Sequence, residues 1–152
     1  MILPKDELEM YLWKHIPISK AMGVTVKEAS KLKITLEAPL LNNLNHKKTV
    51  FGGSLHAVAT LSCWSLLHLN IADIYVKPVQ IVIAKSEVNY LLPVSTNFEA
   101  ECEMPDLTKW ERFLKTFQRM GKARLSLSAK IMKGEKTYVD YLGVFVALMD
   151  KQ

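Results

Sequence analysis

NLNHKKTVFGGSLHAVATLSCWSLLHLNI, residues 43–71, is the stretch that decides the fold. A polar loop ends in the pair Gly52 and Gly53, and the segment after this pair carries no acidic residue, lysine or arginine. The segment is apolar on nearly every side of a helix, so the helix must be wrapped by other structure. Backbone N–H groups at a helix start have no partner inside the helix, and they can therefore bind an incoming oxygen or phosphate.

The composition is that of one globular domain, which we expect to span residues 1–152. Hydrophobic residues make up 49% of the chain and charged residues 23%, and neither value suggests disorder. Cys63 and Cys102 have no partner at a metal-ligand spacing, so we expect two buried reduced thiols, no metal and no cofactor. The net charge of +5 could attract nucleic acid or acidic small molecules. Aromatic residues interleaved with basic clusters are not evident, and no nucleic-acid partner is expected.

The charge-free run of residues 49–72 is long enough to raise a membrane span as an alternative. It contains two histidines, an asparagine and three serines, so we expect a buried core helix and no membrane contact. The N-terminus lacks both a basic start before an apolar block and a small-residue cleavage site, which predicts a cytoplasmic location.

Shorter patterns on both sides of this run predict a second helix and several strands. Residues 4–15 are amphipathic and end at Pro17. Residues 24–39 alternate as a strand or a hairpin, with a turn near Ser30. Further strand patterns follow at residues 79–92, 97–104, 122–132 and 137–149.

A short helix is expected to interrupt these strands at residues 106–120, with Asp106 as its cap and Gly121 as its end. The order of elements, with several consecutive strands, favours an α+β class with an antiparallel sheet over alternating α/β. One apolar helix and one sheet imply that the sheet curls around the helix. This arrangement is the hotdog fold.

Three segments carry a family resemblance: NLNHKKTVFGGS at residues 43–54, IVIAKSEVNYLLPV at 81–94 and GKARLSL at 121–127. They resemble the acyl thioesterases of the hotdog fold, and most closely the small thioesterase-like domain that also occurs fused behind GNAT acetyltransferase domains. The resemblance covers nearly the whole chain. It implies hydrolysis of acyl-CoA or acyl-carrier-protein thioesters at the interface of a homodimer or tetramer.

The chain departs from the broader thioesterase family at two positions. The glycine pair is preceded there by histidine, and here by Phe51. An Asp or Glu nine residues further on serves there as base or nucleophile, and here the position is Thr60. Threonine cannot take a proton from water as a carboxylate can. In the closer subfamily the Phe and the Thr look typical, whereas Lys85 stands where that resemblance leads us to expect an acid.

Four residues are candidates for catalysis. The N–H groups of Gly52 and Gly53 suit the developing oxyanion of thioester hydrolysis, helped by the helix dipole, although the pair could instead only allow a tight loop. The resemblance implies that Asn45 holds the attacking water or the thioester carbonyl; the alternative is a residue of an Asx-turn. Thr60 is expected to orient water.

Five other residues are candidates for substrate binding. Phe51, Ser54 and His56 surround the helix start, where Ser54 is expected to cap the helix. His56 shares a helix face with Thr60 and could serve as the missing base, or could be an ordinary core or interface residue. Lys122 and Arg124 could bind the phosphate that CoA and carrier-protein pantetheine both carry, or could be charges on an exposed sheet face.

Two other functional classes stay open from the sequence. The Phe51 and Thr60 substitutions remove the usual ionisable groups, so the protein could bind an acyl thioester without cleaving it. Nucleic-acid or surface binding through the positive charge is a third alternative. No G-x-S-x-G elbow and no G-x-G-x-x-G after a strand is present, which disfavours serine hydrolase and dinucleotide chemistry.

Overall fold

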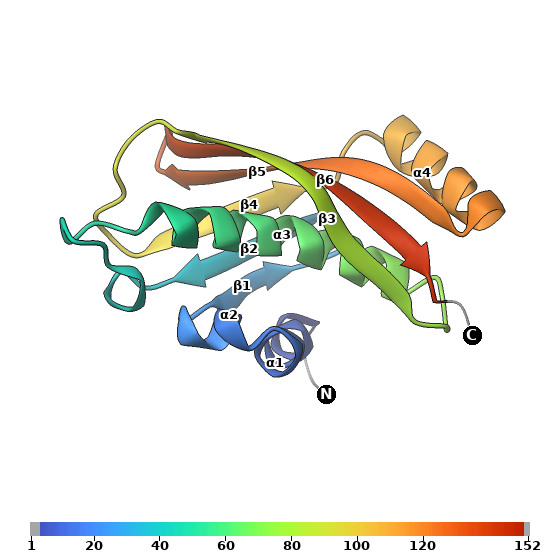
Figure 1. Cartoon of the computed structure of the whole chain (residues 1–152), viewed down its shortest axis with the longest axis horizontal. Helices are drawn as coiled ribbons and strands as arrows, with labels where there is room; N and C mark the ends of the chain where they lie inside the picture. The colour runs from blue at the N-terminus through green and yellow to red at the C-terminus, as the bar shows by residue number, and fades with distance from the viewer. Residues whose placement is uncertain (1–3, 151–152) are drawn as a thin grey trace.

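A six-stranded antiparallel sheet curves around one long helix in the computed structural model, which describes residues 4–150 (Figure 1). The helix is α3 (Gly52–Ala72), and the strand order is β1-β2-β4-β5-β6-β3. The strands are β1 (Thr25–Ala29), β2 (Lys33–Ala38), β3 (Val79–Tyr90), β4 (Phe98–Glu103), β5 (Lys122–Lys133) and β6 (Lys136–Met149). The predicted α+β class and hotdog fold are confirmed.

The smaller helices follow their local signals with one addition. α4 (Leu107–Met120) begins after Asp106, whose side chain accepts from the N–H of Lys109 at 3.0 Å, and it ends at Gly121 with φ 70°. Pro17 ends α1 (Pro4–His15) as predicted, but it also opens a second short helix, α2 (Pro17–Ala21). Proline suits the first helical position because its missing N–H would have no partner there. A 3₁₀ turn, η1 (Leu41–Asn43), precedes the loop to α3.

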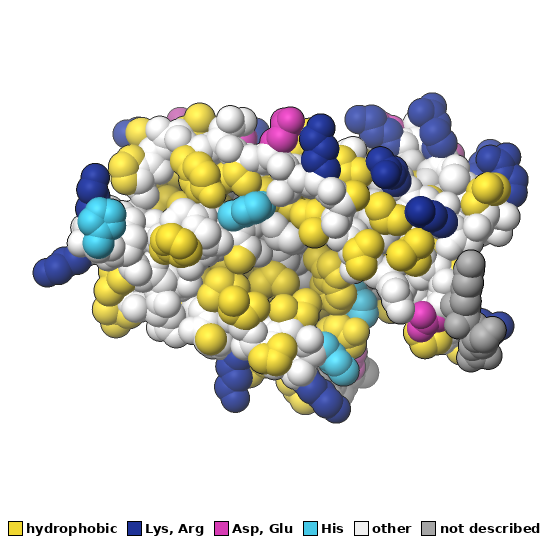
Figure 2. Space-filling model, viewed as in Figure 1, with side chains coloured by type: hydrophobic (Ala, Val, Ile, Leu, Met, Phe, Trp, Pro, Cys, Tyr) yellow, Lys and Arg dark blue, Asp and Glu magenta, His cyan; other side chains and the backbone are white. Residues whose placement is uncertain are grey.

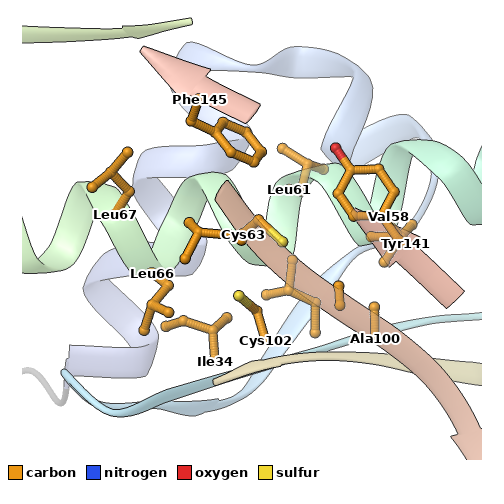
Figure 3. Close-up of a cluster of buried hydrophobic side chains, with 14 of the residues drawn as sticks. Ile34, Val58, Leu61, Cys63, Leu66, Leu67, Ala100, Cys102, Tyr141 and Phe145 are labelled. Carbon is orange, nitrogen blue, oxygen red and sulfur yellow. The ribbon is translucent and has the colours of Figure 1, made fainter. Parts of the chain in front are cut away.

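α3 forms the centre of the core. Its length and apolar composition would suffice to cross a membrane, but the larger part of its most apolar window is buried, as expected of a core helix. Figure 3 shows Cys63 and Leu66 of α3 facing Ile34 and Cys102 of the sheet. Both cysteines are buried and free, as predicted, and burial raises the pKa of the Cys63 thiol well above its usual range.

The two edges of the sheet differ. Along β1, α1 supplies partners for the unpaired backbone: the N–H of Val26 donates to Glu9 Oε1 at 2.9 Å, and Trp13 Nε1 donates to the carbonyl of Val24 at 2.7 Å. β3 pairs on one side with β6, and within residues 4–150 no strand pairs with its other side. Its Val82 is 45% exposed. A long open edge of this kind is normally paired or covered.

Candidate functional site

The loop that leads into α3 is held by Asn43. The Nδ2 of this buried side chain donates to the carbonyls of Met22 and Pro39, both at 2.8 Å. The carbonyl of Asn43 accepts from the N–H of Phe51 at 2.7 Å. The sequence suggested a supporting role for Asn43 in this loop, and its contacts fix the loop against α2 and β2.

Asn45 uses most of its side chain inside the same loop. Its Nδ2 donates to Thr49 Oγ1 at 2.7 Å, and its Oδ1 accepts from the N–H groups of Lys47 and Thr49 at 2.9 and 3.0 Å. These bonds are those of an Asx-turn. A primary amide has two hydrogens on nitrogen, so one remains available to a ligand. Contact between Asn45 and substrate stays a prediction.

The helix start presents two backbone donors. α3 begins at Gly52 with Phe51 as its N-cap residue and no capping side chain, so the prediction that Ser54 caps the helix is wrong. Ser54 is already the third helical residue, and its N–H donates to the carbonyl of Phe51 at 2.9 Å. Among residues 4–150, the N–H groups of Gly52 and Gly53 meet no acceptor. They point out of the first turn, at the positive end of the helix dipole.

Phe51 covers this turn while its own ring remains 57% exposed. A Cβ added to Gly53 would lie 2.3 Å from Cε2 of that ring, so a side chain at this position requires the ring to move. The carbonyl of Gly52 accepts from the hydroxyl of Tyr90, at the end of β3, at 3.0 Å. The glycine pair therefore lies between an aromatic ring and the end of the open edge strand.

A second polar group lies one to two turns further along α3. Thr60 Oγ1 is 2.9 Å from the carbonyl oxygen of His56 and 2.9 Å from the hydroxyl of Tyr141 on β6. His56 Nε2 is 2.9 Å from Ser86 Oγ on β3. The rings of His56 and Tyr141 are 5.7 Å apart between centroids. The side chains predicted on one helix face thus do lie together.

Tyr141 acts as a donor in this group. Burial raises the pKa of its phenol to about 12, so the hydroxyl keeps its proton at neutral pH. If Tyr141 donates its hydroxyl proton to Thr60 Oγ1, the single hydroxyl proton of Thr60 is donated to the carbonyl of His56. In that arrangement one lone pair of Thr60 Oγ1 remains free to accept a hydrogen bond from water.

Lys122 and Arg124 lie away from the glycine pair within one chain. Arg124 pairs with Val146 of β6, which in turn pairs with Val82 of β3. Tyr90, beside Gly52, is eight residues further along β3, a distance of about 26 Å in an extended strand. Both basic side chains are exposed. A single subunit therefore does not bring them together with Gly52 and Gly53.

A cavity of about 300 Å³ lies beside the second half of α3 and the first residues of β3. Its lining includes Trp64, His68, Tyr75 and Ile81. The ring of His68 is 4.8 Å from that of Trp64 between centroids. Burial, with a smaller contribution from a second histidine on α1, lowers the pKa of His68, which favours its neutral form. Aromatic and aliphatic side chains make up most of the lining of the slot, which also includes the charged side chain of Lys77.

Sequence reasoning missed Tyr141, Ser86 and Tyr90. Each lies on β3 or β6, at least 30 residues after the α3 residue that it contacts, and only the register of the sheet brings it to the helix. Ser86 and Tyr90 lie in residues 81–94, a segment that carries the family resemblance, but no local pattern showed that they contact α3. No group of three His, Cys, Asp or Glu side chains that could hold a metal ion occurs within residues 4–150.

Comparison with known proteins gives one family and many similar folds. The model of a family described as "Putative thioesterase (yiiD_Cterm)" matches residues 5–149. A Chlorobaculum tepidum protein described as of "unknown function" is 31% identical, with a TM-score of 0.89 over 96% of this chain and 94% of its own. A "putative thioesterase" from Shewanella oneidensis is 26% identical, with a TM-score of 0.83 over 95% and 96% of the two chains.

A third solved structure shares the fold alone. It is a Pseudomonas aeruginosa protein described as a "Probable Thioesterase", 15% identical, with a TM-score of 0.79 over 99% of each chain.

Proposed function

The chain belongs to the family described as "Putative thioesterase (yiiD_Cterm)", and on that premise we propose that it hydrolyses acyl thioesters of CoA or of acyl carrier protein in the cytoplasm. One observation supports this most: the N–H groups of Gly52 and Gly53 have no acceptor among residues 4–150. Donors fixed in this way are what a thioester carbonyl needs as negative charge develops on its oxygen.

The proposed reaction uses both polar sites of α3, the N–H donors at the helix start and the group around Thr60. The thioester oxygen accepts from Gly52 and Gly53, and water held by Thr60 attacks the carbonyl carbon. The C–S bond then breaks to give a carboxylic acid and a thiol. His56, one turn from Thr60, is the proposed acceptor of the water proton, which it returns to the leaving sulfur. Asn45 is proposed to contribute its remaining amide hydrogen to the carbonyl or the water.

The proposed assembly is a homodimer formed through β3, on which a tetramer could be built. β3 has 12 residues and an unpaired side, whereas β1 is covered by α1. A second copy pairing antiparallel with β3 would satisfy that backbone and cover Val82 and Ile83, which are 45% and 43% exposed. The acyl chain would then lie between α3 and the partner subunit, in the slot lined by Trp64 and His68.

A second candidate function is binding of an acyl thioester without hydrolysis. It is favoured by the hydrogen-bond partners of the Thr60 and His56 side chains, which within residues 4–150 are hydroxyls and a backbone carbonyl and include no carboxylate to act as general base. In this case the same donors would hold the carbonyl, and water would not be activated.

The test is thiol release from a panel of acyl-CoA and acyl-carrier-protein substrates. We expect hydrolysis by the parent protein, at least 10-fold slower hydrolysis by Thr60→Val, and unchanged hydrolysis by the control Thr25→Val, whose exposed threonine lies on β1. Saturable acyl-CoA binding without thiol release at any pH would replace the hydrolase proposal with the binding module. Unchanged hydrolysis in Asn45→Ala would remove Asn45 from the site.

A further inference from the structure

The net positive charge of the chain comes from one region. Residues 107–124 hold six lysines and arginines and one acidic residue, which gives this region the same net charge of +5 as the whole chain. The other 14 basic and 14 acidic residues cancel. The region covers α4 and the start of β5, and Figure 2 shows Lys and Arg side chains gathered over that end of the molecule. It also contains all three arginines, Arg112, Arg119 and Arg124.

These cations are free to bind a ligand. Five salt bridges occur within residues 4–150, and none involves the six basic residues of α4 and early β5. A groove of about 320 Å³ separates α4 from β5. Lys109, Arg112 and Arg124 line it together with the hydroxyls of Thr116 and Ser126. Guanidinium forks match the geometry of phosphate oxygens, and the hydroxyl of Ser126 can donate a further hydrogen bond, whereas that of Thr116 donates to the carbonyl of Arg112.

The position of the second subunit decides whether the groove lies nearer to the helix start of its own chain or to that of its partner. Within one chain Arg124 is about 26 Å along the strands from the level of Tyr90 and Gly52. In the β3 dimer proposed above, an antiparallel pair centred on β3 places Val79 of the partner subunit beside Tyr90.

In the same pairing, Arg124 of the partner subunit lies at the same position along the strand direction as Glu87 of the first subunit. Glu87 is three residues, or about 10 Å, from Tyr90 along β3. The partner's Arg124 also lies three strand spacings, about 14 Å, from Tyr90 across the sheet. The two offsets together separate the partner's Arg124 from Tyr90 by about 17 Å. The flexible pantetheine arm extends far enough to cover such a span. The groove of one subunit is therefore closer to the helix start of the other than to its own.

We propose that the α4–β5 groove of one subunit binds the phosphate-bearing end of a pantetheine thioester whose carbonyl lies at Gly52 and Gly53 of the other subunit. The inference rests on the proposed function and on the β3 dimer. The ligand chemistry is a phosphate ester, which is present both in CoA and in the phosphopantetheine of a carrier protein.

Charge reversal with matched substrates tests the ligand. Arg112→Glu/Arg124→Glu is compared with the control Lys5→Glu/Lys14→Glu, which reverses two exposed lysines of α1. We expect KM for acyl-CoA, for the acyl-carrier protein, or for both to rise at least 10-fold in the groove variant. Acyl-pantetheine, which has no phosphate, should be hydrolysed equally by all three proteins. The substrate that is affected identifies the source of the phosphate. An equal loss with acyl-pantetheine, or no loss with any substrate, would overturn the proposal.

Subunit mixing tests the arrangement across the dimer. Co-expression of Arg112→Glu/Arg124→Glu subunits with Thr60→Val subunits should restore hydrolysis of the affected substrate, because one intact groove then serves one intact helix start. Absence of rescue in isolated mixed dimers would show that groove and helix start act within one chain.

Direct binding separates this proposal from the proposed function. If no substrate is hydrolysed, adenosine 3′,5′-bisphosphate and inorganic phosphate still probe the groove by calorimetry. Binding of either by the parent protein and its loss in the groove variant would support a phosphate site without catalysis. If neither binds, or if duplex DNA binds and is the only ligand lost on charge reversal, the phosphate-ester assignment fails.

Discussion

Tyr141→Phe should change how the stability of the protein depends on pH. The folded protein holds the phenol pKa at about 12 because the ring is buried, whereas the ordinary value is 10.0. Between these values the unfolded chain loses the proton and the folded chain keeps it, so stability falls as pH rises. The loss amounts to about 1.4 kcal/mol at pH 11 and approaches about 2.7 kcal/mol above pH 12.

Phenylalanine at position 141 removes this titration. At pH 8 the variant should be about 1 kcal/mol less stable, since it loses the hydrogen bond to Thr60. At pH 11 that difference should be cancelled and slightly reversed, with the variant about 0.4 kcal/mol more stable, because only the parent protein has been weakened by ionisation of the unfolded state. Urea unfolding of both proteins at pH 8, 10 and 11 measures the effect, and Tyr138→Phe is the control. Parallel pH dependences for parent and Tyr141→Phe would refute the argument that Tyr141 is held neutral by burial.

The remaining predictions concern the helix start and the two sheet edges. Gly53→Ala should slow hydrolysis at least 10-fold because the new Cβ collides with the ring of Phe51 and disturbs the turn that holds the donors. Phe51→Ala in the same background removes this collision and should restore the rate in a thiol-release assay. Glu9→Ala should lower the free energy of unfolding by about 1–2 kcal/mol in urea titrations, since the N–H of Val26 loses its acceptor. Val82→Lys should leave the circular dichroism spectrum unchanged, but the variant should sediment as a monomer and should lack hydrolytic activity. If Val82→Lys is instead a dimer with full activity, the interface lies elsewhere.

Local signals in the sequence were sufficient for most of the elements, although they missed the short helix α2. The apolar run after Gly52 predicted α3, and the pair Asp106 and Gly121 fixed both ends of α4, because caps depend on neighbouring residues only. The contacts between elements depend on strand register instead. Thr60 meets Tyr141 across 81 residues of sequence, a relation that no spacing rule contains. Arg124 was a candidate for phosphate binding from its chemistry alone, and the sequence did not show that β5 places it far along the sheet from the glycine pair.

The contacts of α1 with β1 also limit how large an assembly can grow. Because Glu9 and Trp13 occupy the edge beside β1, a second copy could extend the sheet only at β3, and that copy would leave no further open edge. Two six-stranded sheets would then form one twelve-stranded sheet with no open edge at which a third copy could pair. The N-terminal helix would thus act as a terminator of polymerisation, and removing it should expose a surface from which fibrils could start.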